Sequence, residues 1–460
     1  MASADAPARR PVNGLLLRDV VLLDGRRTDV RLAQGSVVQL GALSRLPGEE
    51  VLDGGGAALS VGLADHHLHL LAMAAAQSSL DLRPAAAPDG AAVEAALQRA
   101  SPDSAGWIRA VGYAEQGGRL TIADLDRLQP TVPVRIQHRS GALWLLNSAA
   151  LREAGLLEEA PSGELWRGDA RLADRVPLGP APDLAAVGRD LAAAGITAVT
   201  DATPDLPRRS QQLLVDAVAD GRLPQRVLLL GGRPDGLNER IGLGPRKLLP
   251  ADHQPPDLDW TLERLHEARA HDRAVAVHCV TREALAVTIA ALREVGPHRR
   301  DRIEHASLVD PAAMAELARL GVTVVTQPGF IADRGDDYRR KLASELGDLY
   351  RIASLQAAGV PTVCSSDAPY GPADPWAVLR AAAQRRTPAG EVLGPQERIT
   401  VRAALNGYLS SLAYPGGPAR RVAIGVPADL VLMHEPWDAV LAAPDRELVR
   451  CTIISGRIFE

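Results

Sequence analysis

Lysine, cysteine and long hydrophobic runs are scarce in this sequence of 460 residues, and the last two scarcities each exclude a class of protein. The three cysteines, Cys279, Cys364 and Cys451, are odd in number and far apart, which argues against a disulfide framework. No apolar run approaches the roughly 18 residues that span a bilayer, and residues 1–10 lack the apolar core of a signal peptide. A net charge of −5 does not indicate binding to nucleic acid or to an anionic membrane, both of which attract positively charged proteins. We therefore expect a cytoplasmic protein with a small-molecule substrate and with neither nucleic acid nor membrane as partner, and a homo-oligomer stays open.

Lysine is almost absent, since only Lys247 and Lys341 occur among 51 basic residues. In a chain that uses arginine nearly everywhere, a lysine on a strand can mark a place where an amine is needed. Chance is the alternative explanation.

The length exceeds that of one hydrophobic core, so we expect one large domain and one small one. Residues 13–56 and 420–460 alternate short apolar runs with turn signals, which predicts short antiparallel strands. Neither segment can bury a core alone, and we expect both to pair into a composite β-sandwich domain. Residues 57–419 would form the large domain, with 71–184 as an insertion over its mouth. Within the insertion, Asn147 is the expected N-cap of a helix.

From residue 183 onward, helical segments alternate with apolar strands. An α/β fold with eight parallel strands and helical crossovers is typical of a closed (β/α)8 TIM barrel. The alternative is an open doubly wound sheet, but no Gly-rich phosphate fingerprint follows a strand to support it. The eight expected strands are residues 57–69, 196–201, 226–230, 246–249, 274–278, 302–305, 322–327 and 361–365.

A histidine-rich stretch ends the first of these strands. Alternation along a strand places Asp65, His67 and His69 on one side, and His66 on the other. Two imidazoles then converge on one point, as in a metal site. A histidine-rich loop with one satisfied hydrogen bond is the ordinary alternative.

Residue types that bind metals recur at or just past the ends of the other strands. In a barrel, strand ends arranged in a ring would aim these side chains at one axial point. Each alone has an ordinary explanation: His278 could be a core histidine, and Asp367 could start a turn. Their joint placement is hard to obtain by accident. The set is His67, His69, Lys247, His278, His305 and Asp367.

Several stretches together resemble a known family: residues 62–70, His278 with Glu283 and Ala284, residues 302–306, Gln327 with Pro328, residues 366–369 and residues 425–432. They are similar to the amidohydrolase superfamily, and within it to the amidohydrolase-3, YtcJ-like branch. The resemblance implies a metal-dependent barrel with a composite β-sandwich, acting on carbon–nitrogen bonds other than peptide bonds. It also implies that His67, His69, His278 and His305 are metal ligands, that Lys247 is a carbamylated bridging ligand, and that Asp367 is the catalytic acid/base and a further ligand.

One position departs from the family pattern. Gly141 and Ala142 stand where the resemblance leads us to expect Gly-His, so Ala142 would change specificity and His138 is a candidate stand-in. Residues 333–340 are expected to be a solvated mixed-charge segment. Ordinary loop packing is the alternative for every candidate substrate contact. These candidates are His138, Trp144, Phe330, Arg334 and Tyr370.

The expected ligands also have a physical rationale. Neutral imidazoles and a carboxylate suit zinc or a similar cation, and the lack of a close cysteine pair argues against a closed structural site. We expect one or two ions, with a carbamylated Lys247 if there are two. Their charge would lower the pKa of a bound water to roughly 7, and Asp367 would pass its proton to the leaving nitrogen. The same groups would serve an esterase, a lactonase or a deaminase, and a catalytically silent barrel used as a binding module is the non-enzymatic alternative.

Overall fold

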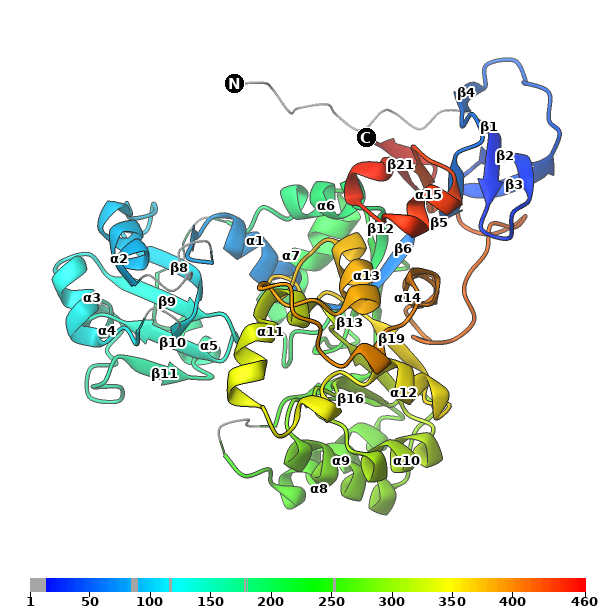
Figure 1. Ribbon diagram of the computed structural model, residues 1–460. Helices are drawn as coiled ribbons and strands as arrows, with labels where there is room; N and C mark the ends of the chain where they lie inside the picture. The colour runs from blue at the N-terminus through cyan, green and yellow to red at the C-terminus, as the bar shows by residue number, and fades with distance from the viewer. Residues whose placement is uncertain (1–13, 84–89, 116–117, 178, 180, 251–253) are drawn as a thin grey trace. The chain divides into compact units, whose positions relative to one another are not determined.

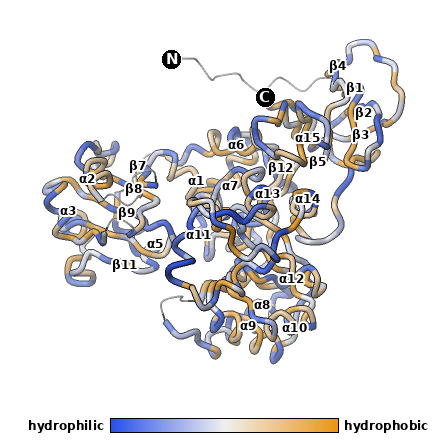
Figure 2. Tube along the Cα trace, viewed as in Figure 1, coloured by the Kyte–Doolittle hydropathy of each residue, from blue (hydrophilic) through white to orange (hydrophobic). Residues whose placement is uncertain are grey.

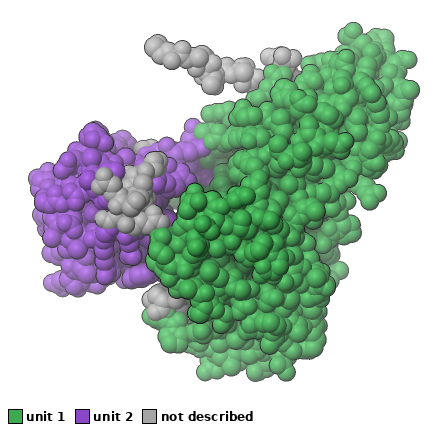
Figure 3. All heavy atoms as spheres, viewed as in Figure 1, with its two compact units in different colours: residues 1–69, 185–460 green, residues 70–184 purple. Residues whose placement is uncertain are grey.

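The structure is a computed structural model of an α/β protein (Figure 1). It describes residues 14–83, 90–115, 118–177, 179, 181–250 and 254–460. Residues 1–10, on which part of the expected location rests, and residue 13, where the expected small domain begins, lie outside the described residues. The chain divides into two compact units, one of residues 1–69 with 185–460 and one of residues 70–184 (Figure 3). Among the described helices, none has both the length and the apolar character needed to cross a bilayer.

Strands from both ends of the chain share one sheet of eight strands. They are β1 (Leu15–Leu22), β2 (Arg27–Ala33), β3 (Ser36–Gly41), β4 (Glu50–Asp53), β5 (Ala58–Val61), β20 (Leu430–Met433), β21 (Val449–Ile454) and β22 (Arg457–Phe459). Their order is β22-β21-β20-β5-β1-β2-β3, with β4 paired to β1. β5 runs antiparallel to β20, and Val61 lies opposite Leu430. The backbone hydrogen bonds of this ladder therefore hold the two chain ends together (Figure 1).

Two further sheets of unit 1 are entirely parallel. The first has the order β14-β13-β12-β6 and the second the order β15-β16-β17-β18-β19. Their strands are β6 (Leu63–Leu68), β12 (Ile196–Asp201), β13 (Arg226–Leu229), β14 (Ile241–Leu243), β15 (Arg246–Leu248), β16 (Val275–Cys279), β17 (Arg302–His305), β18 (Thr323–Thr326) and β19 (Thr362–Cys364). Each strand expected after residue 190 is present. β6 and β12 are buried along their whole length, as apolar strands of parallel sheets are.

The first expected strand is divided in two. The break lies at Gly62, which separates β5 in the terminal sheet from β6 in the parallel sheet. A Cβ atom at Gly62 would lie 2.1 Å from Thr197 Cγ2, so only glycine allows this close approach to β12. An unbroken apolar run therefore serves two sheets, which the alternation of residue types does not reveal.

Backbone hydrogen bonds also join the two parallel sheets at both edges. The amide of Lys247 donates to the carbonyl of Leu230, just past β13, at 3.1 Å. The amide of Asp367, just past β19, donates to the carbonyl of His67 in β6 at 2.8 Å. The carboxyl ends of β6 and β19 are therefore side by side.

Ten helices of the described part of unit 1 follow or flank these strands: α6 (Leu184–Ala193), α7 (Arg208–Ala219), α8 (Leu258–Ala270), α9 (Arg282–Val295), α10 (Pro311–Leu320), α11 (Gly329–Lys341), α12 (Ile352–Ala357), α13 (Pro375–Gln384), α14 (Val401–Tyr408) and α15 (Trp437–Ala442). Thr281 and Asp310 cap α9 and α10 by accepting the free amides of Ala284 and Ala313. Both helices bury an apolar face in the cluster that includes strands β16 to β18. Figure 2 shows the mixed orange and blue of such half-buried helices in α9 and α10.

Residues 70–184 form the second unit, with a five-stranded sheet of order β11-β10-β9-β8-β7. Its elements are α1 (Leu70–Gln77), β7 (Leu80–Asp81), α2 (Gly90–Arg99), β8 (Ile108–Tyr113), α3 (Ile122–Leu128), β9 (Val134–His138), β10 (Leu143–Leu146), α4 (Ser148–Glu153), β11 (Glu164–Trp166) and α5 (Asp169–Ala173). The side chain of Asn147 accepts the amide of Ala150 at 2.9 Å, which confirms the expected N-cap of α4. Two buried apolar clusters give this unit a core of its own.

Candidate metal centre

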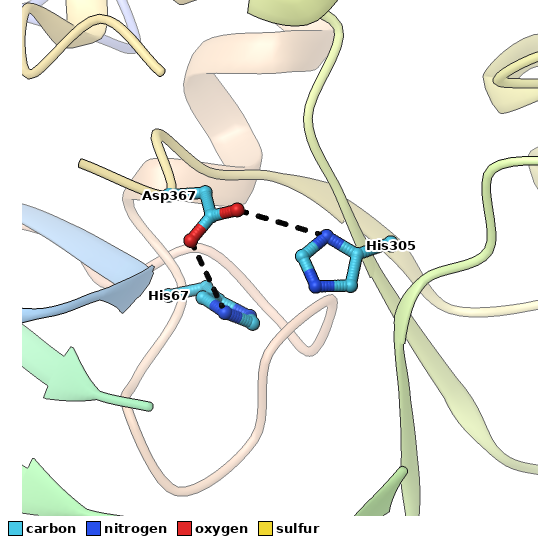
Figure 4. Close-up of side chains that lie close together, drawn as sticks. All are labelled: His67, His305 and Asp367. Atoms are coloured by element: carbon cyan, nitrogen blue, oxygen red, sulfur yellow. Dashed lines mark ion pairs between the residues drawn. The ribbon is translucent and has the colours of Figure 1, made fainter. Parts of the chain in front are cut away.

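His67, His305 and Asp367 meet at the carboxyl ends of β6, β17 and β19, and all three are buried (Figure 4). One ligand atom from each lies within 4.8 Å of the other two. His67 Nε2 is 3.5 Å and His69 Nε2 is 3.2 Å from Asp367 Oδ1, and His305 Nδ1 is 3.9 Å from Asp367 Oδ2. The carboxyl ends of parallel strands are where α/β proteins place their ligands.

The other two expected ligands lie in the same group. Lys247 Nζ on β15 is 3.5 Å from His67 Nε2, and the His278 ring on β16 is centred 4.5 Å from the His305 ring. Burial lowers the pKa of Lys247 to about 8, although the carboxylates of Glu304 and Asp367 oppose this shift. The structure therefore brings together all six residues that the sequence singles out.

Glu304 on β17 orients the His67 ring. Burial raises the pKa of Glu304, but Arg302 and Lys247 outweigh burial and hold this pKa below its usual value. An ionised carboxylate only accepts hydrogen bonds, so His67 Nδ1 donates to Glu304 Oε2 and Nε2 keeps its lone pair. Burial and Lys247 also lower the pKa of His67 well below its usual value, which favours the neutral ring that metal ligation requires.

Gln327 orients the His305 ring, as Glu304 orients that of His67. Its amide nitrogen donates to Ser365 Oγ at 2.9 Å, so its oxygen accepts from His305 Nδ1 at 2.7 Å and His305 Nε2 keeps its lone pair. Burial and His278 lower the pKa of His305 to about 3. The backbone leaves strand geometry at His305, where φ is 68°. Glu304 and His305 can therefore both serve this centre, although neighbours on a regular strand face opposite ways.

Asp367 carries a buried oxygen, Oδ1, that faces two imidazole rings. This oxygen makes ion-pair contacts with His67 Nε2 and His69 Nε2, but no contact of good hydrogen-bond geometry with a described residue. Burial raises the pKa of Asp367, but His67, His69 and His305 together hold it below its usual value, so the carboxylate is ionised. A buried anionic oxygen beside imidazole nitrogens that can act as ligands is a donor set that fits a divalent metal ion.

Sequence reasoning assigned no role to Glu304, Arg302, Gln327 or Thr203. An acidic residue inside a buried strand is seldom unpaired, and this signal could have identified Glu304. Thr203 Oγ1 lies 3.1 Å from His69 Nδ1, but it comes from a loop and only the fold matches it to His69.

Tyr370, Phe330 and Arg334 form one group next to these residues. The Tyr370 ring is centred 5.4 Å from the His69 ring, edge to face. Arg334 Cζ lies 4.1 Å from the centre of the Phe330 ring, and Arg334 Nη2 donates to the Tyr370 carbonyl at 2.7 Å. Their role as substrate contacts stays a prediction.

The expectation of a solvated segment at residues 333–340 is wrong in part. These residues belong to α11, which is mostly hydrophilic (blue) in Figure 2. Asp337 is nevertheless only 5% exposed, and the Arg334 side chain is largely covered. The helix buries one side of a charged sequence, because Phe330 and Ile331 anchor it to an apolar cluster.

His138 and Trp144 lie in the second unit. His138 Nδ1 is 2.8 Å from Ser140 Oγ at the end of β9. Trp144 on β10 is only 4% exposed, and its Nε1 donates to Asp169 Oδ1 at 3.1 Å. Ala142 is also buried. Both candidate contacts have partners inside this unit, and their role towards substrate stays a prediction.

The fold and the site define the class of protein: an α/β enzyme with a centre suited to a divalent metal ion at the carboxyl ends of parallel strands. The chain belongs to the Amidohydrolase family, whose family model matches residues 50–459. It is therefore a hydrolase that acts on carbon–nitrogen bonds other than peptide bonds. The predicted membership of the amidohydrolase superfamily and its YtcJ-like branch is confirmed.

Known proteins similar to this chain cover nearly its whole length. The proposed amidohydrolase YtcJ of Bacillus subtilis (strain 168) is 26% identical over 95% of this chain and 97% of its own length. The N-substituted formamide deformylase of Arthrobacter pascens is 25% identical over 89% of this chain and 90% of its own. The crystal structure of an uncharacterized metal-dependent hydrolase from Pyrococcus horikoshii OT3 matches with a TM-score of 0.74 and 19% identity, over 96% of this chain and 99% of the other, which shows a shared fold.

Proposed function

We propose that this protein is a cytoplasmic, metal-dependent amidohydrolase that cleaves an amide or cyclic amide bond of a small molecule. The observation that carries this proposal is the meeting of His67, His305 and Asp367 in one buried cluster. One relative is named as a deformylase of N-substituted formamides, which are amides, and this supports the substrate class.

We also propose a closed (β/α)8 barrel, in which β14 and β15 together supply one of eight strands. The hydrogen bonds from Lys247 to Leu230 and from Asp367 to His67 support this closure, because they join the two parallel sheets at both edges. The terminal sheet would then be the small β-sandwich domain of residues 13–56 and 420–460, with residues 71–184 as an insertion in the barrel sequence.

The proposed metal is zinc, held by His67, His69, His278, His305 and Asp367 as one or two ions. For two ions, a carbamylated Lys247 would be the bridging ligand, and arginine could not replace it because it has no amine to modify. The position of Nζ, 3.5 Å from His67 Nε2, supports this role.

A divalent cation bound here would lower the pKa of water to roughly 7 and stabilise negative charge on the attacked carbonyl oxygen. The chain's own residues do the rest. Asp367 accepts the proton of the attacking water and delivers it to the leaving nitrogen. Glu304 and Gln327 hold the rings of His67 and His305 so that each keeps a lone pair directed away from its partner.

Paired substrates test the reaction type. We expect small N-acyl amines and cyclic amides to be hydrolysed with release of the amine, measured as product against an uncatalysed sample. The matched control is the ester or lactone with the same acyl group, because the same site activates water towards any leaving group. Cleavage of esters or lactones with no cleavage of amides would refute the proposed bond type, and no hydrolysis of either set would favour a silent binding module.

Glu304→Gln tests the positioning of His67. The amide of glutamine is neutral, so its hydrogen bond from His67 Nδ1 is weaker than that to a carboxylate. The substitution also removes the ion pair with Arg302. We expect the metal affinity to fall by about 10–100-fold, measured by competition with a chromogenic chelator. Glu263→Gln is the control, since its carboxylate is exposed on the surface of α8. Equal metal affinity in both variants would show that Glu304 does not support a ligand.

A further inference from the structure

A pocket lies at the amino ends of the parallel strands, opposite to the metal centre. It is a cavity of about 160 Å³. Pro245 and Pro361 directly precede β15 and β19, and Arg302 and Thr323 are the first residues of β17 and β18. Because these strands are parallel, their amino ends meet at the edge that the metal residues do not use.

The lining of this pocket is positively charged. Arg299, Arg300 and Arg302 contribute three guanidinium groups, and no acidic residue is among the described residues that line the cavity. Glu304 pairs with Arg302 and offsets one of these charges. A surplus of about two positive charges remains, which attracts an anion.

Two of these arginines carry buried donors without partners. The Arg302 side chain is 2% exposed, and its Nη1 has no hydrogen-bond partner among the described residues. The Nε atom of Arg300 is also buried and has no hydrogen-bond partner among the described residues. Buried charged donors are normally paired, and both of these atoms belong to arginines that line the cavity, so this part of the chain has more cationic donors than acceptors.

We propose that this pocket binds a phosphate group, outside the proposed hydrolytic site. A phosphate dianion matches the charge surplus, and guanidinium groups bind phosphate oxygens in pairs. A carboxylate carries only one charge and would leave part of the surplus unpaired. The Thr323 side chain adds a further polar group to the lining.

The loop after α14 completes the pocket wall. Gly416 has a φ of 76°, and a Cβ there would lie 3.0 Å from Pro361 Cβ. Glycine therefore lets this loop pack directly against the start of β19.

Arg302 is not a suitable residue for a test of this pocket. It pairs with Glu304, which in turn accepts a hydrogen bond from His67, so substitution of Arg302 would disturb the metal centre. The test therefore uses Arg299 and Arg300.

The test is titration of the full-length protein, as purified, with inorganic phosphate at constant ionic strength, followed by calorimetry and thermal shift. We expect saturable binding that weakens by about tenfold or more in Arg300→Gln, because a charge-assisted hydrogen bond is lost. Arg299→Gln, at an exposed position, should weaken binding several-fold and serves if Arg300→Gln does not fold. Arg18→Gln, exposed on the terminal sheet, is the matched control and should bind like the parent.

Phosphate can also bind metal ions, and the variants separate the two sites. Binding that is unchanged in both Arg300→Gln and Arg299→Gln would place phosphate elsewhere and overturn the proposal. Acetate that binds as tightly as phosphate would overturn the choice of a dianion. Titration with glycerol 3-phosphate identifies the source: tighter binding than inorganic phosphate supports a phosphate ester, and weaker binding supports the free ion.

Discussion

Asp367→Asn is expected to lower kcat by roughly 10²–10⁴-fold, because this is the range of rate acceleration that general acid–base catalysis contributes. Asparagine has nearly the shape of aspartate, but its amide cannot accept the proton of the attacking water or deliver it to the leaving nitrogen. The three histidines next to Asp367 remain, so the metal content and the melting temperature should stay close to those of the parent. The measurements are steady-state amide hydrolysis, metal analysis and thermal unfolding.

Asp272→Asn is the matched control for this change. The Asp272 side chain is fully exposed at 100%, so the same chemical substitution should leave kcat unchanged. Hydrolysis by Asp367→Asn at the parental rate would remove Asp367 from the mechanism. A silent binding module would show no difference between parent and variant in turnover, metal content or fold.

Metal removal is expected to abolish hydrolysis. Protein purified without added metal should carry one to two equivalents of zinc or a similar ion, and treatment with a chelator should lower the rate below detection. Without the cation, the pKa of the attacking water returns from roughly 7 to about 16, and little hydroxide is available at neutral pH. Addition of zinc should restore the rate. The measurements are elemental analysis and hydrolysis of the same sample.

The control for metal removal is the same chelator saturated with zinc beforehand, which should leave the rate unchanged. A metal-free preparation that keeps its full rate would end the metal-dependent proposal. Loss of activity that zinc does not restore, together with a changed melting temperature, would point to unfolding instead.

Local residue patterns predicted much of the fold. Apolar runs such as residues 275–277 are buried on both faces in a parallel sheet, and this burial leaves a continuous hydrophobic run in the sequence. Asn147 was predicted as an N-cap from one side chain and its position, because capping is a contact within four residues. The division at Gly62 escaped prediction, since its cause is Thr197, which is distant in the sequence.

In the candidate site too, features that depend on neighbouring residues in the sequence were predicted, and features that depend on distant residues were not. Its six predicted residues carry side chains that bind metals and stand at strand ends, so their type and position were enough to select them. Glu304 and Gln327 act only through His67 and His305, and these pairings depend on strands that the fold brings together. Trp144 shows a limit of residue type, because an aromatic residue looks alike in sequence whether or not it packs in a buried cluster, and only the structure shows that Trp144 does.

The sequence by itself determined the family, the alternation of helices and strands after residue 183, and the side chains able to hold a metal ion, because these follow from residue types and their spacing along the chain. Only the tertiary structure decided which ring nitrogen of His67 and of His305 is held by a partner, that Asp367 lies among three imidazole rings, and that three arginines line a cavity at the other end of the strands. The physical reason is that hydrogen-bond partners, burial and summed charge depend on distances between residues that are remote in the sequence, and folding alone sets those distances.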